Sequence, residues 1–341
     1  MNKRNLYILI SVLVVLLLIG GGIVTWLALR PSDDNPNLTD PNPVGVVWWR
    51  PITNNTLSGD LPAGQPCDIT LLNFAYQNSV NEIYLNQHVL RDVNPPNADN
   101  PLGFFGPNGL NYLVAPTRAF IALASERNIS VFMTIGDDGG WLVNRTQFDN
   151  IMRGLRVYQS IVEDNEKFAG VQFNIEPHQQ TDWNENRTIW LQRKIDFVEH
   201  VTDTYGDEFT LDWIIPFWWR ESSTDRITHR NEENVLAYRA IIREADRVSV
   251  MAFRNTAETM IHVSTDILNY ANQLEKEVIL MGTIIYTGGE QSPHAQFLES
   301  GNDVMLYQLG RLPNLVAQEF QNVKISTAIH HIITWYNMVN A

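Results

Sequence analysis

The sequence is poor in cysteine and in positive charge, and both deficits exclude classes of protein. Cys67 is the one cysteine among 341 residues, which rules out an intrachain disulfide framework. Lysine and arginine together number 24 against 38 acidic residues, for a formal net charge of -14. A chain this acidic is a poor partner for nucleic acid or for an anionic membrane surface, so we expect neither.

Two kinds of binding motif are also missing. No glycine-rich phosphate loop follows the first apolar run of the folded part, which argues against a nucleotide-binding sheet. Glu176, His178 and His331 are the nearest candidates for metal ligands, but no His-x-x-x-His element with an acidic residue occurs. We therefore expect no metal and no other cofactor.

The N-terminal part carries a long segment without charge. Residues 6–29 are 24 uncharged residues, enough to cross a bilayer as a helix. Lys3 and Arg4 precede them, so the positive-inside rule places residues 1–5 in the cytoplasm and the rest of the chain outside. Residues 30–43, rich in Pro, Asp and Asn, predict a solvated stalk. A cleaved signal peptide is the alternative, but its apolar core is usually about 7–15 residues long. We therefore favour an uncleaved signal-anchor and a single-pass membrane protein whose folded domain is extracellular, periplasmic or lumenal.

Sequons for N-glycosylation are the second feature that bears on localisation. They begin at Asn37, Asn54, Asn128, Asn144 and Asn186. In a eukaryotic secretory host these asparagines would accept glycans. Sequons also arise by chance in a chain rich in asparagine. We therefore expect a glycoprotein only if the chain enters such a secretory pathway.

Beyond residue 43, short apolar runs alternate with helical patterns. The eight runs are nearly continuous, as strands buried on both faces should be. They span 44–49, 68–75, 129–135, 168–176, 209–217, 247–253, 278–285 and 325–332. The helical patterns span 116–127, 146–163, 186–204, 232–245, 257–276 and 313–322. This alternation predicts an α/β fold, a (β/α)8 TIM barrel over residues 44–341, with an open doubly wound sheet as the alternative.

Two links between the predicted strands depart from the regular pattern. The link at 51–66 has no clear helix, and residues 77–111 form a long insertion rich in Pro, Asn and Gly. Because the insertion follows a predicted strand, we expect it to lie over the carboxyl-terminal mouth of the barrel.

Residues 168–178 are the most informative stretch. Side chains alternate along a strand, so Gln172, Asn174 and Glu176 share one face of an otherwise apolar strand. A buried polar row costs free energy unless it has a use. Pro177 should end the strand, which places Glu176 at the carboxyl end, where parallel α/β folds carry their chemistry.

This stretch resembles the strand 4 signature of family-18 glycoside hydrolases, the chitinase-like barrels. The signature reads aromatic-Asp-Gly-aliphatic-Asp-x-Asp-x-Glu, and its last Glu, the family's general acid, falls on Glu176. Its three Asp positions are occupied here by Ala169, Gln172 and Asn174.

Other elements resemble the same family in the same order. They are Asn73-Phe74-Ala75-Tyr76 for the second strand, Thr134-Ile135-Gly136 with Gly139-Gly140-Trp141 for the third, Met251-Ala252-Phe253-Arg254 for the sixth, and Trp335 for the Trp that floors the sugar site. A closer likeness is to poorly characterised barrels with Asp-Ile-Glu-Pro on strand 4 and Ala-Ile-His-His on strand 8. Here those elements are Asn174-Ile175-Glu176-Pro177 and Ala328-Ile329-His330-His331.

The resemblance implies a mechanism that this sequence only partly supports. In the family an Asp orients the substrate's acetamido group and a Tyr hydroxyl holds it, and these positions are Asn174 and Phe253 here. Asn can bind an amide but cannot balance a cationic intermediate, which argues against that substrate-assisted route. A route with two carboxylates stays open, with Asp137 or Asp138 as the partner of Glu176. Two other acids are less well placed: Glu290, and Asp212, which we expect at the bottom of the barrel.

The remaining candidates are side chains suited to binding a sugar. We expect substrate contacts from Trp48, Tyr76, Gln172, His178, Trp218, Met251, Phe253, Arg254, Tyr286, His331 and Trp335. Arg254 would bind an acidic group of the sugar, or else pair with Glu176 as a structural carboxylate. His330 and His331 point to opposite faces of a strand, and we favour His331 for the lumen.

Two functions of different classes fit these residues. The first is a membrane-anchored glycoside hydrolase that acts on a polysaccharide or glycan outside the cytoplasm, with Glu176 as its general acid. The second is an inactive, lectin-like barrel that binds a glycan. The lost Asp and Tyr favour the second, whereas the retained Glu176 favours the first.

Overall fold

The computed structural model describes residues 44–59, 61–62, 65–86, 105–106, 109–110, 114–137, 139–219, 226–285 and 293–341. The predicted cytoplasmic stub, anchor and stalk at residues 1–43 lie outside these ranges, as does much of the predicted insertion at 77–111. Within the described ranges, every helix is too short or too polar to span a bilayer. The anchor at 6–29 stays a prediction.

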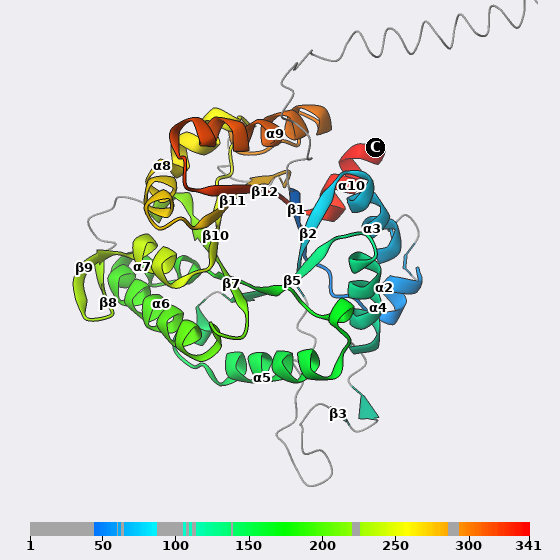
Figure 1. Cartoon of the computed structure of the whole chain (residues 1–341), viewed down its shortest axis with the longest axis horizontal. Coiled ribbons are helices and arrows are strands. Elements are labelled where there is room, and N and C mark those ends of the chain that lie inside the picture. The colour runs from blue at the N-terminus through cyan, green and yellow to red at the C-terminus, as the bar shows by residue number, and fades with distance from the viewer. Residues whose placement is uncertain are drawn as a thin grey trace, which may run out of the picture. The chain divides into compact units, whose positions relative to one another are not determined.

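Eight parallel strands close into a barrel, which confirms the predicted (β/α)8 architecture (Figure 1). Their order around the barrel is β1-β12-β11-β10-β7-β6-β5-β2, and each neighbouring pair is parallel. The strands are β1 (Val44–Trp48), β2 (Val80–Leu85), β5 (Ser130–Asp137), β6 (Gly170–Ile175), β7 (Thr210–Pro216), β10 (Arg247–Met251), β11 (Glu277–Thr283) and β12 (Lys324–His330). Because all eight run the same way, their carboxyl ends meet on one face of the barrel.

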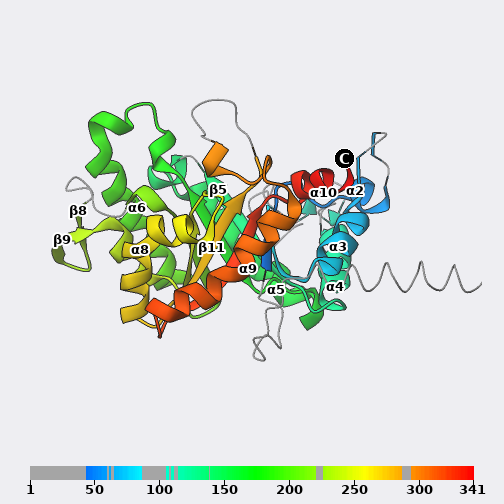
Figure 2. The ribbon, with the colours of Figure 1, turned by 90° about the horizontal axis from the view of Figure 1, so that it is seen from above.

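Helices surround the barrel and cover the outer face of the sheet (Figures 1 and 2). They are α2 (Asn54–Ser58), α3 (Asp68–Gln77), α4 (Val114–Ser125), α5 (Thr146–Ile161), α6 (Trp183–Tyr205), α7 (Ala237–Glu244), α8 (Ala257–Gln273), α9 (Asn302–Glu319) and α10 (Ile332–Asn340). Five of the six predicted helical patterns fall mainly on helices, and the sixth, 232–245, is helical only from Ala237, because Glu232–Leu236 form a strand. The start predicted for α9 at residue 313 is wrong, because Pro313 lies inside the helix rather than at its first turn.

The second predicted strand, 68–75, is wrong, because those residues form helix α3. Asp68, Leu71, Leu72 and Ala75 are buried, at the i, i+3, i+4, i+7 spacing of one helix face. The second barrel strand is instead β2, which lies inside the predicted insertion. The link at 51–66, predicted without a helix, contains the short helix α2.

The barrel interior has its own apolar cluster, separate from the core between sheet and helices. It consists of Val47, Tyr84, Phe132, Ile214, Met251, Ile279, Met281 and Ala328, with Trp49 and Phe253 packed against it. Among the eight strands, β6 adds no apolar side chain to this cluster and presents Gln172 and Asn174 instead. The polar row of the sequence is therefore a real feature of the interior.

Short 3-10 turns follow three strands at the carboxyl face. η3 (Pro177–Gln179) follows β6, η4 (Phe217–Trp219) follows β7, and η5 (Pro293–Ala295) lies beyond β11. Pro177 at the first position of η3 ends the strand as predicted. Two further turns, η1 (Gly140–Leu142) and η2 (Asp164–Glu166), flank α5. The turns after β6 and β7 project His178 and Trp218 toward the barrel mouth.

Two antiparallel hairpins form small sheets of their own, separate from the barrel sheet. β3 (Phe105–Gly106) pairs with β4 (Gly109–Leu110), and β8 (Arg226–His229) pairs with β9 (Glu232–Leu236). The turn of the second hairpin consists of Arg230 and Asn231, both at positive φ, as tight hairpin turns require.

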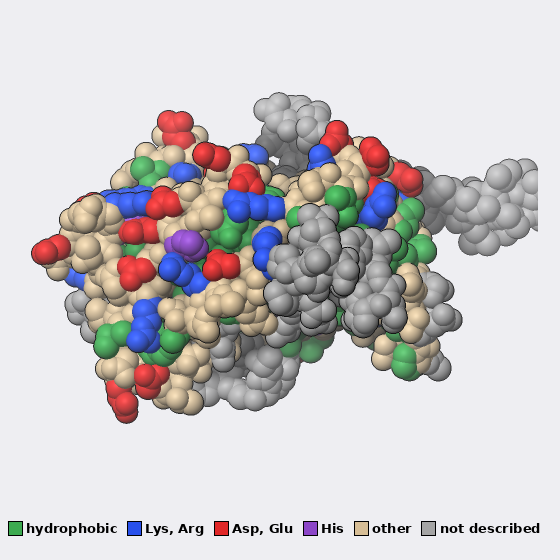
Figure 3. All heavy atoms as spheres, turned by 90° about the horizontal axis from the view of Figure 1, so that it is seen from below, with side chains coloured by type: hydrophobic (Ala, Val, Ile, Leu, Met, Phe, Trp, Pro, Cys, Tyr) green, Lys and Arg blue, Asp and Glu red, His purple; other side chains and the backbone are tan. Residues whose placement is uncertain are grey.

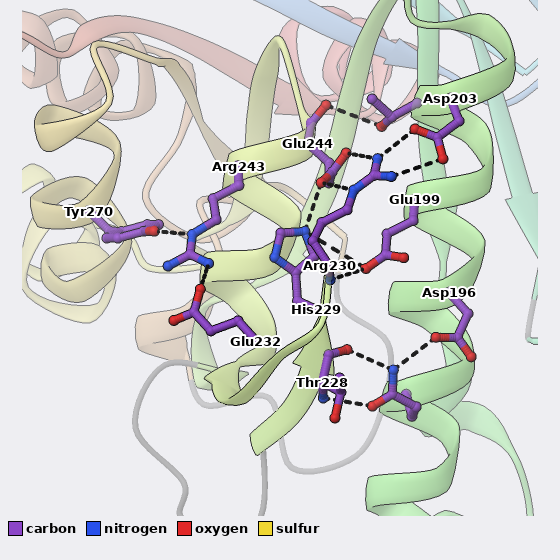
Figure 4. Close-up of polar contacts among 12 residues, drawn as sticks. Asp196, Glu199, Asp203, Thr228, His229, Arg230, Glu232, Arg243, Glu244 and Tyr270 are labelled. Carbon is purple, nitrogen blue, oxygen red and sulfur yellow. Dashed lines mark hydrogen bonds and ion pairs between the residues drawn. The ribbon is translucent and has the colours of Figure 1, made fainter.

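Ion pairs hold the β8–β9 hairpin against helices α6 and α7 (Figure 4). Arg230 reaches Asp203 of α6 at 2.7 Å and Glu244 of α7 at 2.8 Å, and buried His229 lies 2.7 Å from the same Glu244. Figure 3 shows acidic and basic side chains interspersed on one face of the described part of the molecule.

Candidate functional site

A pocket of about 790 Å³ opens at the carboxyl ends of the barrel strands. It is built from six strands and the turns that follow them. Its lining comprises Val47, Trp49, Gln172, Asn174, Glu176, His178, Gln179, Ile214, Phe217, Trp218, Met251, Phe253, Arg254, Met281, His294, Ala295 and His330. Eight of the residues predicted for the site therefore line one pocket: Glu176, Asn174, Gln172, His178, Trp218, Met251, Phe253 and Arg254.

The alternation predicted for residues 168–176 is observed. Gln172, Asn174 and Glu176 line the pocket, whereas Phe173 and Ile175 are buried in the core between sheet and helices. The strand therefore carries three polar side chains up the inside of the barrel, and the last of them is the carboxylate at the mouth.

Gln172 forms the floor of the pocket, and its own polar atoms are already engaged. Its side-chain nitrogen donates to Asp212 at 2.9 Å and to Ser249 at 3.1 Å, and its oxygen accepts from Thr134 at 3.1 Å. With its amide so committed, Gln172 is better suited to shaping the floor than to binding a ligand.

Below this floor lies a buried ionic network. Asp212 lies 3.6 Å from Arg247, whose guanidinium also reaches Glu82 at 2.9 Å. Tyr84 donates to Glu82 at 2.6 Å. Burial raises the pKa of Asp212 to about 6, although Arg247 and the hydrogen bonds from Gln172 and Ser249 act against the rise. Asp212 therefore lies under the pocket floor and outside its lining, as its place near the start of its strand predicts.

Glu176 sits where the pocket opens. Its side chain is 16% exposed, and Nε2 of His178 lies 3.6 Å from its carboxylate. The side-chain amide of Gln179 donates a hydrogen bond to the same carboxylate oxygen. Burial lowers the pKa of His178, and the charge of Glu176 opposes that shift. Asn174 Oδ1 is buried and accepts no hydrogen bond from any described residue, which leaves it available to a ligand amide or hydroxyl.

Aromatic side chains form one wall of the pocket. Trp218 is 43% exposed, and its ring meets His178 edge-on at 5.5 Å. The guanidinium of Arg254 lies 4.4 Å from the ring centroid of Phe217 and donates to the carbonyl of Phe253. These contacts orient Arg254 within the lining, and Trp218 stays partly exposed to solvent.

Two positions predicted for the lumen are shifted by one residue. Trp48 is fully buried against Phe120 of α4, and its neighbour Trp49 lines the pocket instead. His331 caps helix α10, where Nδ1 accepts from the backbone N–H of Thr334, and His330 lines the pocket. A shift of one residue turns a strand side chain to the opposite face.

Two further predicted positions are wrong. Tyr76 lies on helix α3, outside the barrel, and is 56% exposed. Trp335 lies on α10 and is fully buried; its indole N–H donates to Asn302 at 2.8 Å and its ring packs on Phe74. Trp335 therefore joins helices and does not floor the pocket.

Four predicted residues cannot be placed in the pocket. Asp138 and Tyr286 lie outside the described residues, as does Glu290, and only the backbone of Asp137 is described, at the end of β5. Among the described lining residues, Glu176 is the one carboxylate. Within the described ranges, no three His, Cys, Asp or Glu side chains gather closely enough to hold a metal ion.

Several residues at or beside the site were not among those predicted from the sequence. Trp49, Gln179, Phe217, His294 and His330 line the pocket, and Lys194 of α6 is buried directly behind Glu176. His330 could have been found from the alternation on β12, where Ser326 and Ala328 share its face. Lys194 could have been found as a charge within the apolar stripe of α6, between Trp190 and Val198.

The fold and the pocket together define a (β/α)8 barrel with a candidate active site at its carboxyl face. No family model and no curated protein matches the sequence. A GH18 chitinase from Pseudoalteromonas aurantia is similar at 11% identity over 87% of this chain and 99% of its own, with a TM-score of 0.45. An endo-beta-N-acetylglucosaminidase from Cordyceps militaris is similar at 8% identity over 87% and 88%, with a TM-score of 0.46. A beta-mannanase from the blue mussel Mytilus edulis is similar at 10% identity over 88% and 90%, with a TM-score of 0.44. At this level of similarity we interpret the pocket from its own geometry.

Proposed function

We propose that this barrel hydrolyses a glycosidic bond of a polysaccharide or glycan, with Glu176 as the general acid. The observation that carries the proposal is the position of Glu176. It is a carboxylate at the end of a polar strand face, at the mouth of a pocket whose wall is aromatic. Sugar-binding pockets need both flat apolar surfaces and a few convergent polar groups.

In the proposed reaction, protonated Glu176 donates its proton to the glycosidic oxygen as the bond to the anomeric carbon breaks. Water then adds to that carbon by one of two routes: directly, with a second carboxylate taking its proton, or after that carboxylate has formed a covalent intermediate with the sugar, with Glu176 taking the proton of the water. We propose Asp137, the last residue of the neighbouring strand β5, or Asp138, the next residue in the chain, as the second carboxylate. Phe253 lines the pocket but has no hydroxyl to hold an acetamido group, so the substrate-assisted route is disfavoured.

Other lining residues would bind the sugar. Trp218 offers an exposed ring for stacking, and Asn174 offers an unengaged carbonyl oxygen. Arg254, oriented by Phe217, would bind a carboxylate or sulfate on an acidic sugar. His178 lies between Trp218 and Glu176 and would contact the ligand at the same place.

We also propose that residues 6–29 anchor the protein in a membrane, with the barrel outside the cytoplasm. The support is the length of this uncharged segment and the basic residues before it. If the proposal is right, the protein stays in the membrane fraction at alkaline pH, and protease with access to the non-cytoplasmic side of that membrane digests the barrel. Release of the full-length protein by alkali would contradict it.

A catalytically inactive, glycan-binding barrel is the second candidate. The specific observation that favours it is that Asn174 and Phe253, both in the pocket lining, occupy the positions of an Asp and a Tyr in the chitinase-like barrels. Such a lectin would use the same aromatic wall without any need for an acid.

One assay separates the two functions. The protein is incubated with a panel of polysaccharides that includes N-acetylated and uronic-acid-containing chains, and reducing ends are counted. Glu126→Gln is the matched control, because Glu126 is an exposed carboxylate after α4, with 67% of its side chain accessible. Turnover by the parent and by Glu126→Gln, but not by Glu176→Gln, would support the hydrolase. Binding of one chain without turnover, retained in Glu176→Gln, would support the lectin.

A further inference from the structure

A lysine amine is buried directly behind Glu176, outside the pocket lining. Lys194 of α6 is fully buried, and its Nζ donates a hydrogen bond of 2.9 Å to the main-chain oxygen of Ile175. That oxygen belongs to the peptide bond that joins Ile175 to Glu176. Lys194 thus holds the backbone from which the Glu176 side chain enters the pocket.

The other neighbour of this amine is an aromatic ring. Nζ of Lys194 lies 4.6 Å from the ring centroid of Trp219, which is itself fully buried. Trp219 stacks on Trp183 and meets the ring of His178 edge-on at 6.1 Å. Lys194 therefore joins the backbone of Glu176 to the aromatic residues that follow β7.

A purely structural lysine would not be expected at this position. Lysines in an apolar helix stripe normally extend their amines to solvent, whereas the side chain of Lys194 has no exposed surface. An ammonium group in such a site costs free energy unless nearby groups stabilise it. A ring face and one carbonyl replace only part of its hydration.

The charge of this amine is linked to two titratable groups of the pocket. Burial lowers the pKa of Lys194 to about 7, and the carboxylate of Glu176 acts in the opposite direction. Burial also lowers the pKa of His178; Glu176 raises it, and Lys194 lowers it further. Among the described residues, Glu176 and His178 are the titratable groups whose charges interact with that of this amine, and the ring next to it is that of Trp219.

We propose that Lys194 is a positioning residue of the Glu176 site: it holds the Ile175–Glu176 peptide and couples its own charge to those of Glu176 and His178. While the amine is protonated, it disfavours a second cation at His178. This inference rests on the proposed role of Glu176, but its test needs no substrate and no turnover.

The test is an NMR titration of the His178 ring in the full-length protein and in three variants. In Lys194→Met the midpoint for His178 should rise by about half a unit or more, because a neighbouring cation is removed. In Glu176→Gln it should fall, because the stabilising anion is removed. Lys276→Met is the matched control: Lys276 also donates to a main-chain carbonyl, that of Ala245, but at the opposite end of the barrel. It should leave the midpoint unchanged.

A folded Lys194→Met protein whose His178 midpoint equals that of the parent would overturn the proposal. If Lys194→Met fails to fold, titration of the Lys194 amine in the parent decides the question. A midpoint near 7 that falls in Glu176→Gln supports the coupling, whereas an ordinary midpoint of about 10.4 overturns it. A lack of hydrolysis would count against the proposed function alone, since neither titration depends on it.

Discussion

The indole N–H of Trp49 donates a hydrogen bond to Nε2 of His330, with 2.5 Å between the two nitrogens. The bond joins the residue after β1 to the last residue of β12, at the point where the first and last strands of the closed barrel meet in the candidate site. Because an indole nitrogen only donates, Nε2 of His330 is the unprotonated nitrogen and the ring is neutral. Burial, and to a lesser extent His331, lowers the pKa of His330 to about 4.

His330 should therefore make stability fall in acid. As pH drops from about 6.5 to about 4, the unfolded chain takes up a proton at this histidine while the folded protein does not. The free energy of unfolding should lose up to about 3 kcal/mol over that window. His330→Gln keeps an acceptor for Trp49 but cannot titrate, so its stability should fall less steeply. Chemical denaturation at several pH values measures the difference, and parallel curves for the two proteins would contradict the prediction.

Asp212 should have the opposite effect on stability: its contribution should fall as pH rises. Its pKa of about 6 in the folded barrel lies above the ordinary value of 3.8. As pH rises from about 4 to about 6, the unfolded chain releases this proton first, so the contribution of Asp212 to stability falls by up to about 3 kcal/mol. Asp212→Asn removes this loss, and its stability relative to the parent should increase with pH across the window.

The control for both titrations is the double variant His330→Gln with Asp212→Asn. Between about pH 4 and 6 the two residues change the unfolding free energy of the parent in opposite directions. Each single variant should therefore show the pH dependence of stability that the remaining residue causes. If the double variant shows the same pH dependence as either single variant, the assignment is wrong.

In the hairpin network of Figure 4, the contribution of each glutamate to the unfolding free energy should depend on its burial and not simply on its having an ion pair. The side chain of Glu244 is 9% exposed and accepts from both His229 and Arg230. The side chain of Glu232 is 60% exposed and pairs with Arg243 alone. Glu244→Gln should cost about 1–3 kcal/mol of unfolding free energy, because it leaves buried donors poorly matched. Glu232→Gln should change it by less than about 0.5 kcal/mol. Equal costs in thermal or denaturant unfolding would contradict this difference.

The wall formed by Trp218 should carry much of the ligand affinity. Trp218→Ala removes an exposed ring from the pocket, so affinity for the glycan should fall about tenfold while the melting temperature is nearly unchanged. Tyr307→Ala is the matched control, since Tyr307 is an exposed aromatic on α9, 54% accessible and outside the pocket. Calorimetry with the best ligand of the panel measures both variants. An unchanged affinity for Trp218→Ala would place the ligand elsewhere.

The sequence was sufficient to predict the barrel, because its buried strands are apolar runs separated by helical patterns. It failed at β2, where Asn81 and Glu82 interrupt the apolar run. Glu82 is tolerated inside the barrel because Tyr84 of the same strand and Arg247 of the distant strand β10 satisfy it. The run at 68–75 resembles a strand by composition, although its buried positions follow a helical period.

Residues of the site could be predicted only where the alternation of side chains along a single strand determines which of them face the pocket. Gln172, Asn174 and Glu176 follow from alternation within β6, and the same rule applied to β12 favours His330 over His331. Lys194 could not be assigned to Glu176 from the sequence, because only the packing of α6 on β6 brings the two together. The aromatic wall also depends on the short turns after the strands, which periodicity does not reveal.

If Glu176 protonates the leaving group, its loss should matter less for a leaving group that needs no proton, and a comparison of two leaving groups tests this. Turnover of a natural glycan and of an aryl glycoside with a good leaving group is measured for the parent and for Glu176→Gln. We expect the variant to lose about a hundredfold or more on the natural glycan and far less on the aryl glycoside, whose leaving group needs no proton. Equal losses on both substrates, or undiminished turnover of the natural glycan, would contradict the assignment of Glu176 as the general acid.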